Sequence, residues 1–380
     1  MTTMRTLRLL AVSLLLLSLA ATAGSAAAGA AGVHQTAGQR HCSLAVPLSI
    51  PPAWISSAVF VPSLQRILVV DSALNRLLLF TEGGQGTVIP DREIAQAAKL
   101  PSLVAATANG FVLKLVGRDV VTFGPDLRLA AQSKSLVAAA PGGQGTLGSI
   151  YQWTVAGPSI VAYGSIRSAN FPDGYQLGFL RTPLPDHPGV TEMLMPFEDG
   201  TYYVYGNQYL SSVGSTAYFL RMGMGKRATL FKVPPGASEP VPLENAVPDL
   251  FRGVQTLKVK MTGPADAPAA YAELEKLKIP AGLCTGPDGF LYLLTRQPGK
   301  LAGRTDWWLH RIDPEDGRVT GKAHLPTNAK HLTVVAGPDR FFLFERGDVN
   351  PIGSQVIKSL ISVDASVVEH ASLEGTEICP

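Results

Sequence analysis

The sequence predicts an all-β protein: a six-bladed β-propeller of four-stranded antiparallel blades with a short helical insertion. Three observations lead to this fold. Short apolar runs bounded by Gly, Pro, Asn and Asp recur along the chain, with almost no helical periodicity. The runs return at intervals of about 40–50 residues, which is the length of one propeller blade. The charged fraction is 16%, below the typical figure of about 25%, so we expect a large buried core rather than a disordered chain.

Two strands identify each predicted blade. The paired apolar runs are 67–71 with 76–80, 111–116 with 120–123, 159–163 with 175–180, 202–205 with 216–220, 290–294 with 307–312, and 341–344 with 359–363. If the first run of each pair is the second strand of a blade, the steps between blades are 44, 48, 43, 88 and 51 residues. This spacing favours a propeller over a sandwich or a barrel, which short strands alone would also allow.

The most complete repeat covers residues 279–325. It contains the turn Gly286–Gly289 before one strand and the turn Pro314–Gly317 after the next. In both turns Pro sets φ early and Gly supplies a positive φ late, as tight hairpins require. This repeat and the run Ile67–Phe80 resemble NHL-type repeats. The resemblance implies a six-bladed, TolB-like β-propeller with a central channel and loops on two faces, and it brings no catalytic residues with it.

The step of 88 residues predicts an insertion at about 243–278. Within it, residues 267–278 are expected to form a helix, because Ala is frequent there and Glu and Lys stand three residues apart at Glu273/Lys276 and Glu275/Lys278. The alternative is a degenerate seventh blade. A helix does not belong in a blade, so six blades with an insertion is the preferred prediction.

The N-terminus predicts export. Arg5 and Arg8 precede an apolar run, 9–20, and small residues follow with cleavage sites after Ala23 or Ala28. We therefore expect a signal peptide at 1–28, a flexible segment at 29–41 and one propeller domain at 42–380, secreted or periplasmic. The alternative, a membrane anchor, is disfavoured because the run is shorter than the ~20 residues of a membrane span. No later stretch is apolar for 18 residues, so no transmembrane segment is expected after cleavage.

Three cysteines are present, and their spacing fits no zinc module. Cys42 begins the predicted domain and Cys379 is the penultimate residue, so a disulfide between them would join the ends of a closed ring in an oxidising compartment. Cys284 is expected to pack as a small buried residue. The competing pair, Cys42–Cys284, stays open.

The formal charge is +3, or about +1 once Arg5 and Arg8 are removed, so no nucleic-acid partner is expected. The sequence lacks the zinc-protease, nucleophile-elbow and EF-hand motifs, which leaves catalytic residues unknown. No cofactor is expected. We expect the protein to be a monomer. In lactonase-type propellers Glu, Asn and Asp from separate blades hold a divalent cation, and Asp71, Asn170, Asn207 and Glu345 are the residues that could be arranged in this way.

Propeller topology brings the connections between second and third strands, and those between blades, to one face. The residues placed on this face as ligand-binding candidates are Asp71, Asn75, Arg118, Arg167, Asn170, Asn207, Arg296, Asp306, Glu345 and Arg346. Arg76 and Arg304 also lie in these connections, so five of the six blades bring an Arg. Guanidinium groups suit the bidentate recognition of carboxylate or phosphate. The alternative is that each Arg pairs locally with an acid of its own loop.

These features favour an exported binding or scaffolding module that takes a small-molecule, peptide or protein ligand, possibly anionic, on its loop face. The alternative function is a lactonase- or hydrolase-like enzyme with a divalent metal in the central channel. Metal content and the convergence of the scattered Asp, Asn and Glu side chains distinguish the two.

Overall fold

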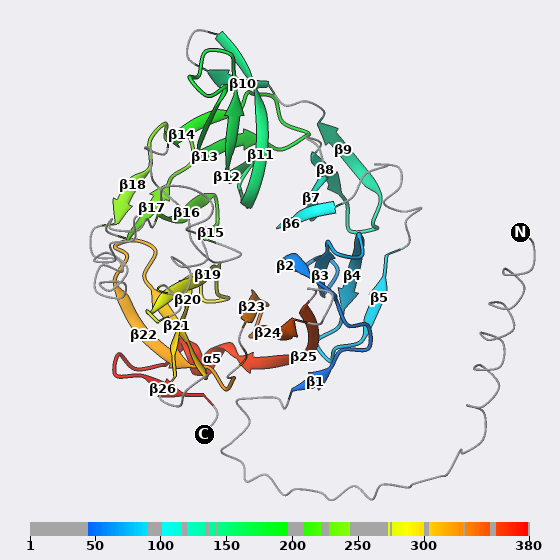
Figure 1. Cartoon of the computed structure of the whole chain (residues 1–380), viewed down its shortest axis with the longest axis vertical. Helices are drawn as coiled ribbons and strands as arrows, with labels where there is room; N and C mark the ends of the chain where they lie inside the picture. The colour runs from blue at the N-terminus through cyan, green and yellow to red at the C-terminus, as the bar shows by residue number, and fades with distance from the viewer. Residues whose placement is uncertain are drawn as a thin grey trace, which may run out of the picture. The chain divides into compact units, whose positions relative to one another are not determined.

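Six sheets, antiparallel except for one added strand, are arranged in a ring (Figure 1). The computed structural model describes residues 45–89, 101–115, 120–133, 137–140, 143–196, 209–221, 228–243, 273, 276–299, 304–327, 329, 331–349 and 355–378. The predicted signal peptide, the flexible segment, Cys42 and Cys379 lie outside these residues.

The first three blades are consecutive in the chain. Blade 1 holds β2 (Ile55–Val61), β3 (Arg66–Asp71), β4 (Arg76–Phe80) and β5 (Gly86–Val88). Blade 2 holds β6 (Pro101–Thr107), β7 (Gly110–Leu115), β8 (Val120–Phe123) and β9 (Leu129–Ser133). Blade 3 holds β11 (Gly143–Ala156), β12 (Ser159–Arg167), β13 (Tyr175–Pro183) and β14 (Glu192–Pro196), with β10 (Val137–Ala140) as a fifth strand beside β11.

The last three blades bring both ends of the described chain into the sheets. Blade 4 holds β15 (Leu210–Val213), β16 (Thr216–Arg221), β17 (Thr229–Val233) and β18 (Val241–Leu243). Blade 5 holds β19 (Ile279–Thr285), β20 (Leu291–Pro298), β21 (Thr305–Ile312) and β22 (Val319–His324), with β26 (Thr376–Glu377) added in parallel to β22. Blade 6 holds β23 (His331–Ala336), β24 (Arg340–Val349), β25 (Gln355–Asp364) and β1 (Val46–Pro47).

The innermost strands close the ring. Each contacts the innermost strand of the next blade in the order β2, β6, β11, β15, β19, β23, and β23 contacts β2 again. The described strands therefore confirm the six-bladed propeller and leave no place for a seventh sheet between blades 6 and 1.

An N-terminal strand completes the last blade. β1 pairs antiparallel with β25, through Val46↔Leu360 and Pro47↔Ser359, so blade 6 combines the N-terminal strand with three strands from the C-terminal part of the chain. The helix α5 (Ala365–Glu369) follows β25, and Asp364 caps it by accepting a bond from Ser366 N. The described residues contain no helix long and apolar enough to cross a membrane.

Each blade packs both of its faces against neighbours. Phe60 and Phe80 of blade 1 contact Phe342 and Phe344 of blade 6, with ring centroids 6.2 and 6.0 Å apart. Because both faces are covered, successive residues of a central strand are buried instead of alternate ones. In β3, the second strand of blade 1, Ile67–Val70 are all fully buried. This explains why the sequence shows continuous apolar runs.

One strand assignment was wrong. The second strand of blade 4 is β16, which begins at Thr216 and pairs with β15 through Leu210↔Phe219; the run 202–205, expected there, lies outside the described residues. Measured between the first residues of the second strands, the steps are 44, 49, 57, 75 and 49 residues. The steps of 43 and 88 residues expected on either side of blade 4 are therefore 57 and 75 residues. Most of the insertion, 243–278, is also outside the described part, although the expected Glu273–Lys276 ion pair is present at 2.6 Å.

A buried histidine makes the stability of blade 5 depend on pH. His310 is 1% exposed, and its Nε2 lies 3.0 Å from Thr295 Oγ1. Burial, with Lys278 and Lys322 nearby, lowers the pKa of His310 to about 3. Between about pH 6.5 and 3 the unfolded chain therefore binds a proton that the folded protein does not, so the free energy of unfolding falls as the pH falls through this range.

We expect His310→Gln to flatten this dependence by up to about 1.4 kcal/mol per pH unit between pH 4 and 6, as measured by urea unfolding. Glutamine is chosen because its amide can still bond to Thr295. His187→Gln, a change at an exposed histidine beside Asp186, is the control and should leave the slope as it is in the unmodified protein. Equal slopes in all three proteins would contradict the assignment to His310.

Candidate functional site

The predicted site residues that the structure describes belong to strands and connections at one end of the channel. We call this end the loop face: it carries the connections from the second to the third strand of each blade and the connections between blades. The opposite end carries the turns from first to second strands. The side chains of Asp71, Asn75, Arg167, Asn170, Arg296, Asp306 and Glu345 are described; Arg118, Asn207 and the side chain of Arg346 are not.

Asp71 holds blade 1 together. Its carboxylate is fully buried and accepts bonds from Ala53 N at 3.1 Å, Trp54 N at 3.0 Å and Arg76 Nε at 2.9 Å. Arg76 also donates to Pro51 O at 3.0 Å. Asp71 thus ties the end of β3 to the segment that enters β2, and its oxygens are engaged in structure. Asn75 lies in the β3–β4 turn at a φ of 51°, a left-handed position that Asn tolerates.

Glu345 has the same role in blade 6. Its two oxygens accept bonds from the hydroxyls of Thr327 and Ser359, the latter at 2.8 Å. Thr327 belongs to the connection that enters β23, so an acid near the end of a second strand again fastens the entering segment. A repeated blade geometry therefore accounts for both acids.

Two of the metal-ligand candidates have structural roles in the described residues. Asp71 and Glu345 are bonded within their own blades. Asn170 is exposed in the β12–β13 loop, where its main-chain N–H donates to Ser168 Oγ. Asn207 lies outside the described residues. Among the residues that are described, no three His, Cys, Asp or Glu side chains are grouped so that they could hold a metal ion.

The arginines of the loop face differ in their surroundings. Arg76 pairs with Asp71, as the alternative of local pairing expects. Arg296 is only 9% exposed and lies near the buried phenol of Tyr209. Arg167, opposite Tyr175 in the β12–β13 pair, and Arg304, before β21, are exposed and form no ion pair with a described residue. Asp306 is half-buried two residues after Arg304.

Sequence reasoning missed a buried lysine near this face. Lys114, the fourth residue of the apolar run Phe111–Leu115, is 7% exposed, and its Nζ donates to Leu115 O at 3.2 Å. Burial lowers the pKa of its ammonium group. The signal in the sequence was a single Lys inside an otherwise apolar run, since Lys is almost never fully buried without a partner.

A cavity occupies the opposite part of the channel. It has a volume of about 340 Å³ and is lined by all six innermost strands near the ends that lead into the first-to-second-strand turns. Its lining includes Ala58, Ala106, Thr154, Ser212, Thr285 and Ala336. We call it the channel cavity. No sequence motif marks it, because each strand contributes only two to four small or apolar residues.

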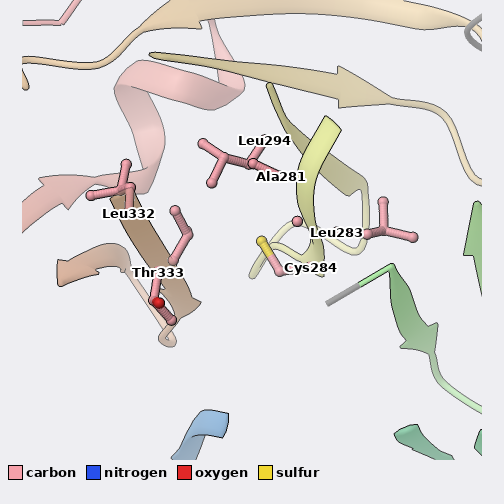
Figure 2. Close-up of a pocket in the computed structure, with 8 residues that line it drawn as sticks. Ala281, Leu283, Cys284, Leu294, Leu332 and Thr333 are labelled. Carbon is pink, nitrogen blue, oxygen red and sulfur yellow. The ribbon is translucent and has the colours of Figure 1, made fainter. Parts of the chain in front are cut away.

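A small crevice extends from this region between β19 and β23 (Figure 2). It has a volume of about 20 Å³, room for one water molecule at most, and Cys284, Leu294 and Thr333 are among its lining residues. Cys284 is a free thiol that donates to Tyr292 O at 3.8 Å, and burial raises its pKa to about 12. It is therefore protonated at neutral pH and serves as the small packing residue that the sequence predicted.

Comparison with known proteins assigns neither a family nor a function to this chain. No protein-family profile and no curated protein matches the sequence. Among solved structures, a gluconolactonase from Xanthomonas campestris is 15% identical, with 86% of this chain and 98% of that one covered and a TM-score of 0.46. The calcium-binding regucalcin from Agrobacterium tumefaciens is 13% identical, with 83% and 94% covered and a TM-score of 0.42.

Hydrazine synthase from Kuenenia stuttgartiensis is 9% identical, with 86% and 82% covered and a TM-score of 0.44. The names of these proteins describe different activities, and a propeller supports many functions through the sites built on it. These similarities therefore assign no function to this chain, and the propeller fold is shown by the strand pairing itself.

Proposed function

We propose that this protein is an exported propeller that works as a binding module and takes an acidic or carboxylate-bearing ligand on its loop face. One observation supports this function above the others: Arg167 and Arg304 are exposed on two separate blades of this face, and neither forms an ion pair with a described residue. Two acids of this face, Asp71 and Glu345, are already bonded within their blades. Unpaired guanidinium groups on one rim attract carboxylates and bind them bidentately.

The enzyme alternative, a divalent metal in the channel, is less well supported by the described residues. The carboxylate oxygens of two of its four ligand candidates, Asp71 and Glu345, already accept structural hydrogen bonds, and a third candidate, Asn170, is exposed. A metal site also needs ligands whose lone pairs are free to coordinate the ion. The wall of the channel cavity offers none of the carboxylate or imidazole groups that this chemistry uses.

The test uses a fluorescein-labelled hexaglutamate peptide as the acidic probe, with fluorescence polarisation as the readout. We expect the double variant Arg167→Ala/Arg304→Ala to bind it at least about fivefold more weakly, since each charged hydrogen bond contributes about 1 kcal/mol or more. Arg128→Ala, at an exposed arginine in the β8–β9 turn at the other end, is the matched control. Treatment with EDTA should leave binding unchanged. Equal weakening by Arg128→Ala, no binding to the unmodified protein, or loss of binding with EDTA would refute the proposal.

Export and the disulfide belong to the same proposal. A signal peptide at 1–28 would deliver the chain to a compartment in which Cys42 and Cys379 can pair, and a bond between them would restrain the unfolded ring. That Cys284 is free agrees with this pairing, because the competing bond would use it. The two other cysteines lie outside the described residues, so the pairing stays a prediction.

A further inference from the structure

We propose that the channel cavity is a second binding site, separate from the loop face, for a small uncharged molecule that carries hydroxyl or amide groups. The inference depends on four features of the cavity: its neutral wall, the strand edges that face it, the hydroxyl groups between blades, and its size.

The wall of the cavity carries no charge. The described residues that line it are Ala, Val, Phe, Pro, Trp, Ser, Thr and Cys, without a single Asp, Glu, Lys, Arg or His. The thiol of Cys284 is protonated at neutral pH, as its raised pKa of about 12 requires. A charged ligand would lose its hydration here and gain no partner of opposite sign, which costs several kcal/mol. The wall therefore selects for uncharged molecules.

Main-chain groups make the same wall polar. The strands β2, β6, β15, β19 and β23 stand at the end of their sheets and pair on one side only. β11 pairs with β10 only through Gly143–Thr146, well before the part that lines the cavity. The second edge of each inner strand thus faces the channel, and a strand edge presents N–H donors and C=O acceptors. The N–H and C=O of Val104 are already bonded to the Ser57 hydroxyl of the neighbouring blade, so other edge groups must bond to a ligand.

Hydroxyl groups connect the inner strands at the level of the cavity. Thr285 Oγ1 donates to Ser212 O at 2.7 Å, so in its 2.8 Å contact with Ser211 the serine must donate. Thr154 Oγ1 donates to Ser212 Oγ at 3.4 Å. Ser212 accepts this bond and donates its own hydroxyl hydrogen to no described residue. It is half-buried in the wall, so it can donate to a ligand.

The volume fits one small ligand. About 340 Å³ is equivalent to about eleven water molecules at their liquid volume of about 30 Å³, and it lies at the lower end of the range for ligand pockets, about 300–1,000 Å³. A neutral ring with a few hydroxyl or amide groups fills such a space and can bond to strand edges from several blades at once.

Two pairs of probes that differ in charge but little in shape test this site: nicotinamide with nicotinate, and methyl glucoside with glucuronate. Saturation-transfer NMR on the full chain reports binding of each. We expect the uncharged member of at least one pair to give a signal at least about fivefold stronger than its anion. Ala106→Phe, which places a ring in the cavity, should remove that signal, and Ser212→Ala, which removes one donor, should reduce it.

Ala130→Phe makes the same change on the exposed outer strand β9 and should retain the signal. The Arg167→Ala/Arg304→Ala protein should retain it as well, which separates this site from the loop face. If Ala106→Phe fails to fold, Ser212→Ala still decides. Equal signals from both members of each pair, no signal from any probe, or a signal that both cavity variants leave intact would overturn the proposal.

Discussion

Replacing Asp71 with Ala should lower the free energy of unfolding by about 3 kcal/mol. The fully buried carboxylate accepts two main-chain N–H bonds and the Nε bond of Arg76. Without it, two amides and a guanidinium that is 22% exposed lose their acceptor. Each unsatisfied buried donor costs about 1–3 kcal/mol, and removal of one partner of a buried ion pair costs about 3–5 kcal/mol. The partial exposure of Arg76 places the expected value at the lower end of that range.

Urea unfolding of Asp71→Ala, Asp71→Asn and Asp126→Ala measures this effect. Asp71→Asn keeps an acceptor oxygen but loses the charge, so its loss should be intermediate. Asp126 is an exposed acid that faces Arg128 at 3.6 Å, and its removal should cost less than about 1 kcal/mol. A loss for Asp71→Ala no larger than that for Asp126→Ala would show that Asp71 is not a structural residue and would make it available again as a ligand.

Opening the ring at its N-terminal strand should have the larger effect on thermal stability. A chain that starts at Pro51 lacks β1, the buried Leu48 and the two bonds by which Ser49 holds the β4–β5 turn, from Ser49 N to Gly84 O and from Gly86 N to Ser49 Oγ. Burial of one Leu contributes about 2 kcal/mol and each hydrogen bond about 1 kcal/mol. Leu48, the two bonds of Ser49 and about 1 kcal/mol from the β1–β25 pairing total about 5 kcal/mol, which corresponds to a fall in Tm of about 10 °C.

The matched control is a chain that starts at residue 44. It also lacks Cys42, so neither protein can form the predicted disulfide, but it keeps β1 and its pairing with β25. Differential scanning calorimetry measures the Tm of both proteins, and the difference reports the contribution of residues 44–50, which include β1. If their Tm values agree within about 2 °C, the pairing of β1 with β25 contributes little, and the ring is held by contacts between the inner strands of blades 6 and 1.

Several parts of the fold could be predicted from the sequence because they depend on neighbouring residues. The turn Gly286–Gly289 and the run Ile67–Val70 mark a hairpin and a doubly buried strand without reference to the rest of the chain. A propeller repeats such units, so their spacing predicts the number of blades. Blade 4 was misassigned because 202–205 and 216–220 are equally apolar, and only the pairing of β16 with β15 distinguishes them.

The sequence could also predict which connections lie on the loop face, because the order of strands within a blade decides where each connection lies. It could not determine what those groups bond to. The partner of Asp71 beyond its own turn is the backbone at 53–54, and that of Glu345 is Thr327, each brought in from the preceding inter-blade connection. Such contacts follow no local sequence pattern. In the sequence, Asp71 and Glu345 therefore cannot be distinguished from acids that are free to bind a ligand.

Only the tertiary structure decided how the ring closes and where it is hollow. β1 and β25 are more than 300 residues apart, and the wall of the channel cavity combines residues from Ala58 to Ala336. Each inner strand contributes small neutral side chains that resemble ordinary core residues when they are considered alone. Their common property, an uncharged wall with strand edges facing inward, arises when six sheets are arranged around one axis, and this arrangement is produced by packing between blades that are distant in the sequence.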